Sequence, residues 1–164
     1  MIVKNLGKNF LINFTIVLLI FSLDRLSKIY VIYLKNKGLD SEIFSSKFLN
    51  IILIWNEGIA FGLLSFNESF FYNILTIIIL VIVLVIFYMA IKSVGLKKYS
   101  LLMVLGGALG NLFDRILYKA VPDFIDLHFG NFHWFIFNIA DIFITVGVFF
   151  LILFEIIYNT KEIK

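Results

Sequence analysis

The sequence predicts an all-α integral membrane protein with four transmembrane helices. Of its 164 residues, 62% are hydrophobic and 15% are charged, and the mean hydropathy is +1.03. Soluble domains have roughly 45–50% apolar and about 25% charged residues, so this composition indicates a polytopic membrane protein. The length suits four spans of about 20 residues each with their connections. We therefore expect one membrane domain over residues 1–164.

Each predicted helix is an apolar run that ends at polar residues. We expect the first at 10–33 as an uncleaved helix, because no small-x-small cleavage site ends the run and apolar residues resume after Lys28. The other three are expected at 69–91, 98–117 and 136–158. The third has a face of small residues that permits close helix contact in lipid. This face consists of Gly106, Gly107, Ala108 and Gly110.

Two long connections, 35–68 and 118–135, carry most of the remaining polar residues. Lys35-Asn36-Lys37-Gly38 predicts a turn. The run from Phe48 to Trp55 is too short to span a membrane, which favours a strand or an interfacial segment. Asn56 to Gly62 contains two glycines and an asparagine, which predicts either a turn with exposed donors or a plain loop that returns to the bilayer.

The distribution of lysine and arginine predicts the orientation. The side with both termini and the 92–98 turn has seven lysines, against four lysines and the helix-end Arg115 on the other side. The positive-inside rule then places both termini in the cytoplasm and the two long connections outside. Polar residues of four segments should meet at this outer surface: Asp24, Asn56, Asn111, Asp114, Arg115, Asp123, Asn138 and Asp141.

Asp123 and Asp141 are the candidate catalytic pair. Asp141 lies in an apolar run, where an ionisable group is costly and indicates a partner or a function. Two carboxyl groups that lie close together share one proton, because ionising both would place two negative charges side by side. The ionised one can activate water, while the protonated one polarises a carbonyl and protonates a leaving amine. This pattern suits amide hydrolysis, but it also suits an ion- or proton-coupled transporter.

Other polar residues are candidates for support. Asp24 and Lys28 are four apart, so they share a helix face as an ion pair. Asn138 lies three residues before Asp141 and should share its face. Asn111, Arg115 and Asn138 could orient the carboxylates and bind substrate carbonyls.

Several other kinds of site are not expected. Asp126, His128 and His133 are of metal-ligand type, but the H-x-x-x-x-H spacing matches no zinc signature, so we predict no metal site. The chain has no cysteine, which excludes disulfides and thiolate chemistry. Its net charge of +3 comes from lysines at the ends of apolar runs, which indicates a membrane surface and not a nucleic-acid partner.

Five short motifs follow one another along the chain: Asp24-Arg25-Leu26-Ser27-Lys28, Asn56-Glu57-Gly58-Ile59-Ala60-Phe61-Gly62, Gly107-Ala108-Leu109-Gly110-Asn111-Leu112-Phe113-Asp114-Arg115, Val121-Pro122-Asp123-Phe124 and Phe137-Asn138-Ile139-Ala140-Asp141. Together and in this order they resemble the motifs of the lipoprotein signal peptidase (signal peptidase II) family. Two positions depart from the family pattern: Pro122 stands where the family often has valine, and Ile59 where it often has alanine.

The resemblance implies a membrane aspartic endopeptidase that removes signal peptides from prolipoproteins, cleaving before the diacylglyceryl-modified cysteine. Asp123 and Asp141 would be catalytic, and Asp126 a peripheral loop charge. Residues that bind substrate or support the site would be Asn56, Gly58, Asn111, Asp114, Arg115, Asn138, Asp24 and Lys28.

The resemblance also implies partners and a location. The partners are the diacylglyceryl-modified prolipoprotein, membrane lipid and a globomycin-type inhibitor, with no cofactor, metal or nucleic acid. The location is the bacterial cytoplasmic (inner) membrane, crossed several times, with both termini cytoplasmic. The active site would lie near the outer face, under a small extracytoplasmic β-like platform formed by loop 35–66.

Overall fold

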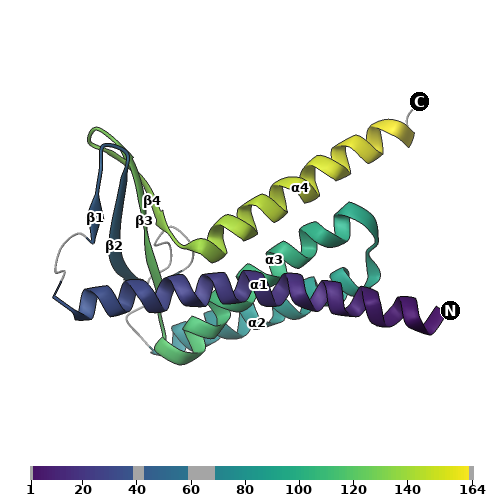
Figure 1. Ribbon diagram of the computed structural model, residues 1–164, viewed down its shortest axis with the longest axis horizontal. Helices are drawn as coiled ribbons and strands as arrows, with labels where there is room; N and C mark the ends of the chain where they lie inside the picture. The colour runs from purple at the N-terminus through teal and green to yellow at the C-terminus, as the bar shows by residue number, and fades with distance from the viewer. Residues whose placement is uncertain (1, 39–42, 59–68, 163–164) are drawn as a thin grey trace.

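Four long helices and a small sheet make up the protein. The computed structural model describes residues 2–38, 43–58 and 69–162. Over these ranges, four helices are long and apolar enough to cross a membrane. The strands gather at one end of the helices, opposite the ends at which the two termini lie (Figure 1). The predicted fold class is therefore confirmed. The elements in order are α1 (Ile2–Asn36), β1 (Phe44–Ser45), β2 (Leu49–Asn56), α2 (Ser69–Lys92), α3 (Gly95–Tyr118), β3 (Val121–Phe129), β4 (Phe132–Phe137) and α4 (Ile139–Glu162).

The helices differ in extent from the predicted ranges, most of all α1, and α3 begins at Gly95 instead of residue 98. Helix α1 begins at Ile2 instead of residue 10. Helix α4 begins at Ile139 instead of residue 136, because Phe132–Phe137 is paired as strand β4. Helix α1 ends at Asn36, and Gly38 has a positive φ of 88°, as expected for the turn predicted there.

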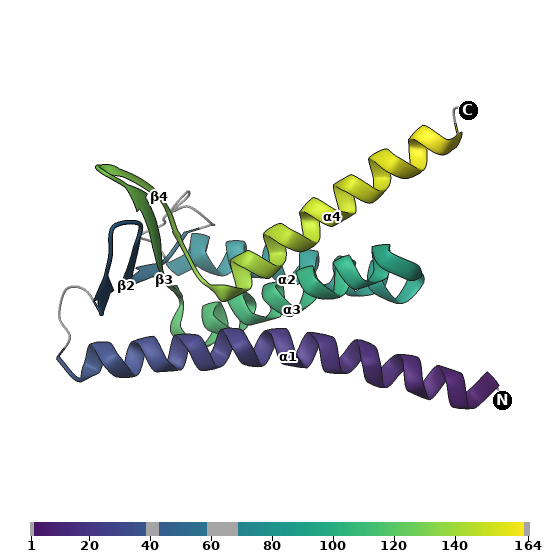
Figure 2. The same ribbon diagram turned by 45° about the horizontal axis from the view of Figure 1, so that its top comes forward.

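The sheet draws on both long connections. Its strand order is β1-β2-β3-β4, and every neighbouring pair is antiparallel. The loop expected at 35–66 contributes β1 and β2 to this platform, and β3 and β4 from the second long connection supply the other two strands (Figure 2). The strand expected at 48–55 is confirmed as β2. Of the predicted 56–62 turn, residues 59–62 lie outside the described part of the chain.

Helix α3 lies at the centre of the helical part. In the most apolar 18-residue stretch of its span, 61% of the residues are buried, against 11–17% in the other three spans. Its glycines allow this close packing. A Cβ at Gly106 would lie 2.8 Å from the Ile20 side chain of α1, and a Cβ at Gly107 would lie 2.5 Å from the Ala140 carbonyl oxygen of α4. The predicted small-residue face is therefore where α3 contacts two neighbouring helices.

Strand β3 follows α3 almost directly, through the left-handed Lys119. This short connection brings the first residues of β3 close to the helices, and Val121, Pro122, Asp123 and Phe124 are all buried. Pairing of β3 with β4 begins at Ile125. Pro122 thus lies where β2 is the only described strand beside β3, a position at which a missing N–H is tolerated.

Replacing Gly107 by alanine should destabilise the protein by about 1–3 kcal/mol, the usual cost of overpacking a close contact. The new methyl group would meet backbone of α4, which cannot rotate away as a flexible side chain would. Unfolding of the detergent-solubilised protein measures the effect. Ile116→Ala on the exposed face of the same helix is the control. Equal stability of Gly107→Ala and wild type would contradict the packing described.

Candidate active site

Asp123 is buried on β3 and held by two amides. Its side chain accepts hydrogen bonds from Asn56 Nδ2 at 2.9 Å and Asn138 Nδ2 at 2.6 Å. The residue is 4% exposed. Burial, reinforced by the negative charge of nearby Asp141, raises the pKa of Asp123 to about 6. This carboxyl therefore changes its protonation state close to neutral pH.

Asp141 lies in the first turn of α4 and forms a reciprocal cap with Asn138. Its Oδ2 accepts a hydrogen bond from the Asn138 backbone N–H at 3.1 Å, while its own N–H donates to Asn138 Oδ1 at 3.1 Å. The pattern is that of a capping box, with Asn138 as the N-cap residue. The Asp141 Oδ1 also accepts a hydrogen bond from Asn111 Nδ2 of α3 at 2.8 Å.

Asn138 therefore contacts both carboxylates. Its Nδ2 donates to Asp123, and its backbone N–H donates to Asp141. Eighteen positions separate the two aspartates in the sequence, yet the one residue between β4 and α4 binds each of them. The sequence predicted that Asn138 and Asp141 share a helix face. In the structure Asn138 precedes the helix, and capping provides the contact.

A buried network of four charged residues lies between α1 and α3 and supports Asp141. Lys28 Nζ lies 2.9 Å from Asp24 and 2.7 Å from Asp114. Arg25 forms ion pairs with the same two carboxylates. Asp24 and Asp114 are fully buried and Lys28 is 1% exposed. The sequence predicted the Asp24–Lys28 pair and named Asp114 as support. It missed Arg25, which directly follows Asp24 within the same motif.

The network reaches the candidate pair through α3 and α4. Lys28 Nζ donates to Asn111 Oδ1 at 2.9 Å, and Asn111 in turn donates to Asp141. Asp24 Oδ1 accepts the backbone N–H of Ala140 at 3.1 Å. The position of Asp141 thus depends on ions carried by α1 and α3.

Arg115, near the end of α3 that leads into β3, contacts Gly58 and Tyr72. Its Nη2 donates to the Gly58 carbonyl at 2.5 Å, and the guanidinium carbon is 6.0 Å from the centre of the Tyr72 ring. Gly58 itself donates to Asn56 Oδ1 at 2.9 Å. Arg115 therefore holds the chain segment that carries Asn56, one of the two partners of Asp123.

The expectation that Asp126 is a peripheral loop charge is wrong. Asp126 is 2% exposed on β3, because β2 and β4 flank it on both sides. It accepts a hydrogen bond from Asn50 Nδ2 at 3.3 Å and lies 2.9 Å from His133 Nδ1. Cross-strand pairing creates this environment, and the spacing of residues in the sequence does not show which residues pair across strands.

Comparison with known proteins gives the family. The model of the family described as "Signal peptidase (SPase) II" matches residues 16–157. The chain belongs to this family. The lipoprotein signal peptidase of Pelagibacter ubique is 50% identical over 155 residues, which are 94% of this chain and 93% of that protein. The lipoprotein signal peptidase of Anaplasma marginale is 41% identical over 88% of this chain and 84% of that protein.

A solved structure agrees with this assignment. A bacterial membrane enzyme structure determined by the in meso method has a TM-score of 0.72 and 32% sequence identity, and the match covers 93% of this chain and 91% of that chain. The sequence resemblance to signal peptidase II is therefore confirmed, as is a multi-pass membrane protein.

Replacing Lys28 by methionine should destabilise the protein by about 3–5 kcal/mol, because it leaves an uncompensated buried charge on Asp24 and Asp114. The matched control is Lys97→Met, which breaks the exposed ion pair of Lys97 with Glu155. Exposed pairs of this kind contribute about 0–1 kcal/mol. Unfolding in detergent at neutral pH measures both. Similar small losses in the two variants would contradict the role assigned to the network.

The pH dependence of stability should differ between wild type and Asp123→Asn. The pKa of Asp123 is raised from its ordinary value of 3.8 to about 6. Its stabilising contribution is thus fully present below about pH 4 and is lost as the pH rises through 6. At 1.36 kcal/mol per pKa unit, the loss is about 3 kcal/mol. Unfolding curves between pH 4 and 7.5 test this, and parallel profiles for both proteins would refute it.

Proposed function

We propose that this signal peptidase II is an aspartic endopeptidase whose catalytic pair is Asp123 and Asp141. It removes signal peptides from prolipoproteins by cleaving before the diacylglyceryl-modified cysteine. The observation that carries the proposal is the joint attachment of both carboxylates to Asn138. The substrate class follows from the relatives, which are named lipoprotein signal peptidases.

In the proposed reaction the two carboxyl groups share one proton. The ionised member removes a proton from water, and the water oxygen attacks the scissile carbonyl carbon. The protonated member donates to the carbonyl oxygen, which yields a tetrahedral intermediate. Collapse of this intermediate breaks the C–N bond: the carboxyl group that took a proton from water gives it to the leaving amine, and the other carboxylate takes a proton back from a hydroxyl of the intermediate as the product carboxyl group forms. No cofactor takes part in these steps.

Burial favours this shared protonation. The two groups are close enough for the charge of Asp141 to act on Asp123, and low polarity disfavours a doubly ionised pair. The amide groups of Asn56 and Asn111 each hold one carboxylate. We assign Asn56, Asn111 and Asn138 as positioning residues for the pair. Arg115 and Gly58 position Asn56 in turn.

The membrane determines how the substrate would reach this pair. Apolar side chains are exposed on all four helices, which suits a lipid environment, for example Phe10, Phe70, Ile116 and Phe149. In the proposed orientation both termini face the cytoplasm, and the sheet lies at the outer face of the bacterial inner membrane. The acyl chains of the substrate then stay in lipid while the scissile bond meets the pair. A globomycin-type inhibitor would occupy the same place.

The transporter alternative receives no support from the comparisons. The matching family and the relatives described above are peptidases. The intramembrane charges of α1 and α3 also pair with one another, two carboxylates with two cations, which suits a structural role.

Cleavage of a diacylglyceryl-modified lipoprotein precursor tests the proposal. Asp123→Asn and Asp141→Asn should each lower the cleavage rate by at least about 10²–10⁴-fold, the usual contribution of a general acid or base. The control is Glu155→Gln, which changes an exposed carboxylate at the far end of α4 and should cleave like wild type.

Two results would overturn the proposal. One is wild-type cleavage by either folded aspartate variant. The other is ion or proton flux in proteoliposomes that depends on Asp123 and Asp141 without any cleavage of the precursor. Thermal unfolding of each variant in detergent shows that the protein is folded.

A further inference from the structure

We propose that Asp126, His128 and His133 form a binding site for a divalent transition-metal ion of the zinc type. The site lies on the β3–β4 hairpin, separate from Asp123 and Asp141, and it is independent of the proposed peptidase chemistry. Each of the three residues offers one ligand atom, and these atoms lie within 4.8 Å of one another. The sequence spacing predicted no metal site, and the strand register leads us to depart from that expectation.

The hairpin register brings the three side chains together. His128 of β3 pairs directly with His133 of β4, around a turn that contains the positive-φ Gly130. Their imidazole rings stack at 5.1 Å with an angle of 22°. Asp126 precedes His128 by two residues on β3, and the β3–β4 register shifts between these two positions. The strand pairing with this shift brings ligand atoms of two imidazoles and one carboxylate within 4.8 Å of one another.

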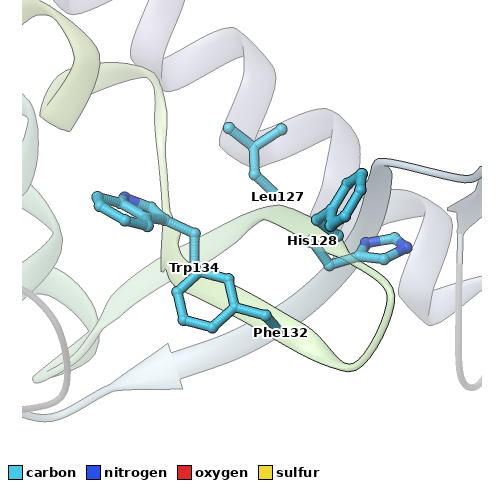
Figure 3. Close-up of a pocket in the computed structure, with 5 residues that line it drawn as sticks. Leu127, His128, Phe132 and Trp134 are labelled. Atoms are coloured by element: carbon cyan, nitrogen blue, oxygen red, sulfur yellow. The ribbon is translucent and has the colours of Figure 1, made fainter.

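The opposite face of the hairpin is apolar. It carries Leu127, Phe129, Phe132 and Trp134, which are 42–72% exposed and line a pocket together with His128. Figure 3 shows Leu127, His128, Phe132 and Trp134, which are among the residues that line this pocket. His128 therefore borders both the metal-ligand cluster and the apolar pocket.

Two features of the cluster indicate a cation at this position. The buried Asp126 carboxylate contacts His133 Nδ1 at 2.9–3.0 Å through both oxygens. The Nδ1 of His128 is buried and has no hydrogen-bond partner among the described residues. A buried polar atom without a partner is costly. A metal ion bound by both imidazoles and the carboxylate would satisfy these atoms together.

Neighbouring strands already hold the carboxylate in place. Asn50 of β2 donates from Nδ2 to Asp126 Oδ2 at 3.3 Å, and Ser45 Oγ of β1 donates to Asn50 Oδ1 at 2.8 Å. Outer hydrogen bonds of this kind orient metal ligands and raise metal affinity. His133, with 53% of its side chain exposed, leaves the site open to ions from solution.

The ligand set selects the class of metal. Two imidazoles and one carboxylate are the donors that Zn²⁺ takes in three-ligand sites with a fourth position for water. Mg²⁺ and Ca²⁺ prefer oxygen donors alone. A bound ion would join β3 to β4 and, through Asn50, to β2. Asp123 lies on β3 and Asn56 lies on β2, so the ion would stiffen the sheet beside the catalytic pair.

Zinc titration of the full-length, tag-free protein in detergent tests the site by isothermal calorimetry. The sequence contains two histidines and no cysteine, so no other imidazole or thiolate competes. We expect one Zn²⁺ per chain and a higher unfolding temperature in excess Zn²⁺. His128→Ala and His133→Ala should each weaken Zn²⁺ binding by at least about tenfold, and Mg²⁺ should not compete.

Asp123→Asn is the matched control, because it removes a buried carboxylate on the same strand outside the cluster. It should bind Zn²⁺ like wild type. Absence of saturable binding to the wild type would overturn the proposal, as would unchanged affinity in the His128→Ala/His133→Ala double variant. Loss of binding in Asp123→Asn would assign the ion to the catalytic pair and overturn it too. His133 is largely exposed, so its replacement tests the site without disturbing the core.

Discussion

The structure depends on a buried set of four charges between α1 and α3. Moving a single ion out of water costs several kcal/mol, so a buried ion persists only when others compensate it. Asp24 and Asp114 are compensated by Arg25 and Lys28, and the set is neutral as a whole. The ion pairs also require α1 and α3 to lie close together, and glycine at position 110 permits this, because a Cβ there would lie 2.5 Å from Asp24 Oδ2. The glycines of α3 and the charges of α1 therefore work as one unit.

A continuous path of hydrogen bonds leads from this network to the candidate catalytic pair. Lys28 holds Asn111, Asn111 holds Asp141, and Asn138 joins Asp141 to Asp123. Each amide in the path uses both its donor and its acceptor, which leaves little freedom for rotation. Such preorganisation suits a site in which two carboxylates must share a proton. Helices thus position Asp141, while the sheet positions Asp123.

Strand β3 places two aspartates in different chemical surroundings. Asp123 meets amide groups and the charge of a second carboxylate, which raises its pKa to about 6. Asp126, three residues further along, meets His133 and Asn50. The first environment favours proton transfer, and the second resembles a metal-ligand set. The same residue type therefore meets two different environments on one strand, according to what the neighbouring strands present to it.

The four spanning helices follow from the amino-acid sequence alone, because apolar runs of sufficient length have no other stable arrangement in lipid. Local pairs such as Asp24 with Lys28 follow from it too, since four residues make about one helical turn. Ordered motifs identified the family. Three contacts emerge only in the folded protein: Arg25 joins the buried ions, Asn138 caps α4 while contacting Asp123, and Asp126 contacts His133. These contacts depend on strand register and helix packing, which the local spacing of residues in the sequence does not encode.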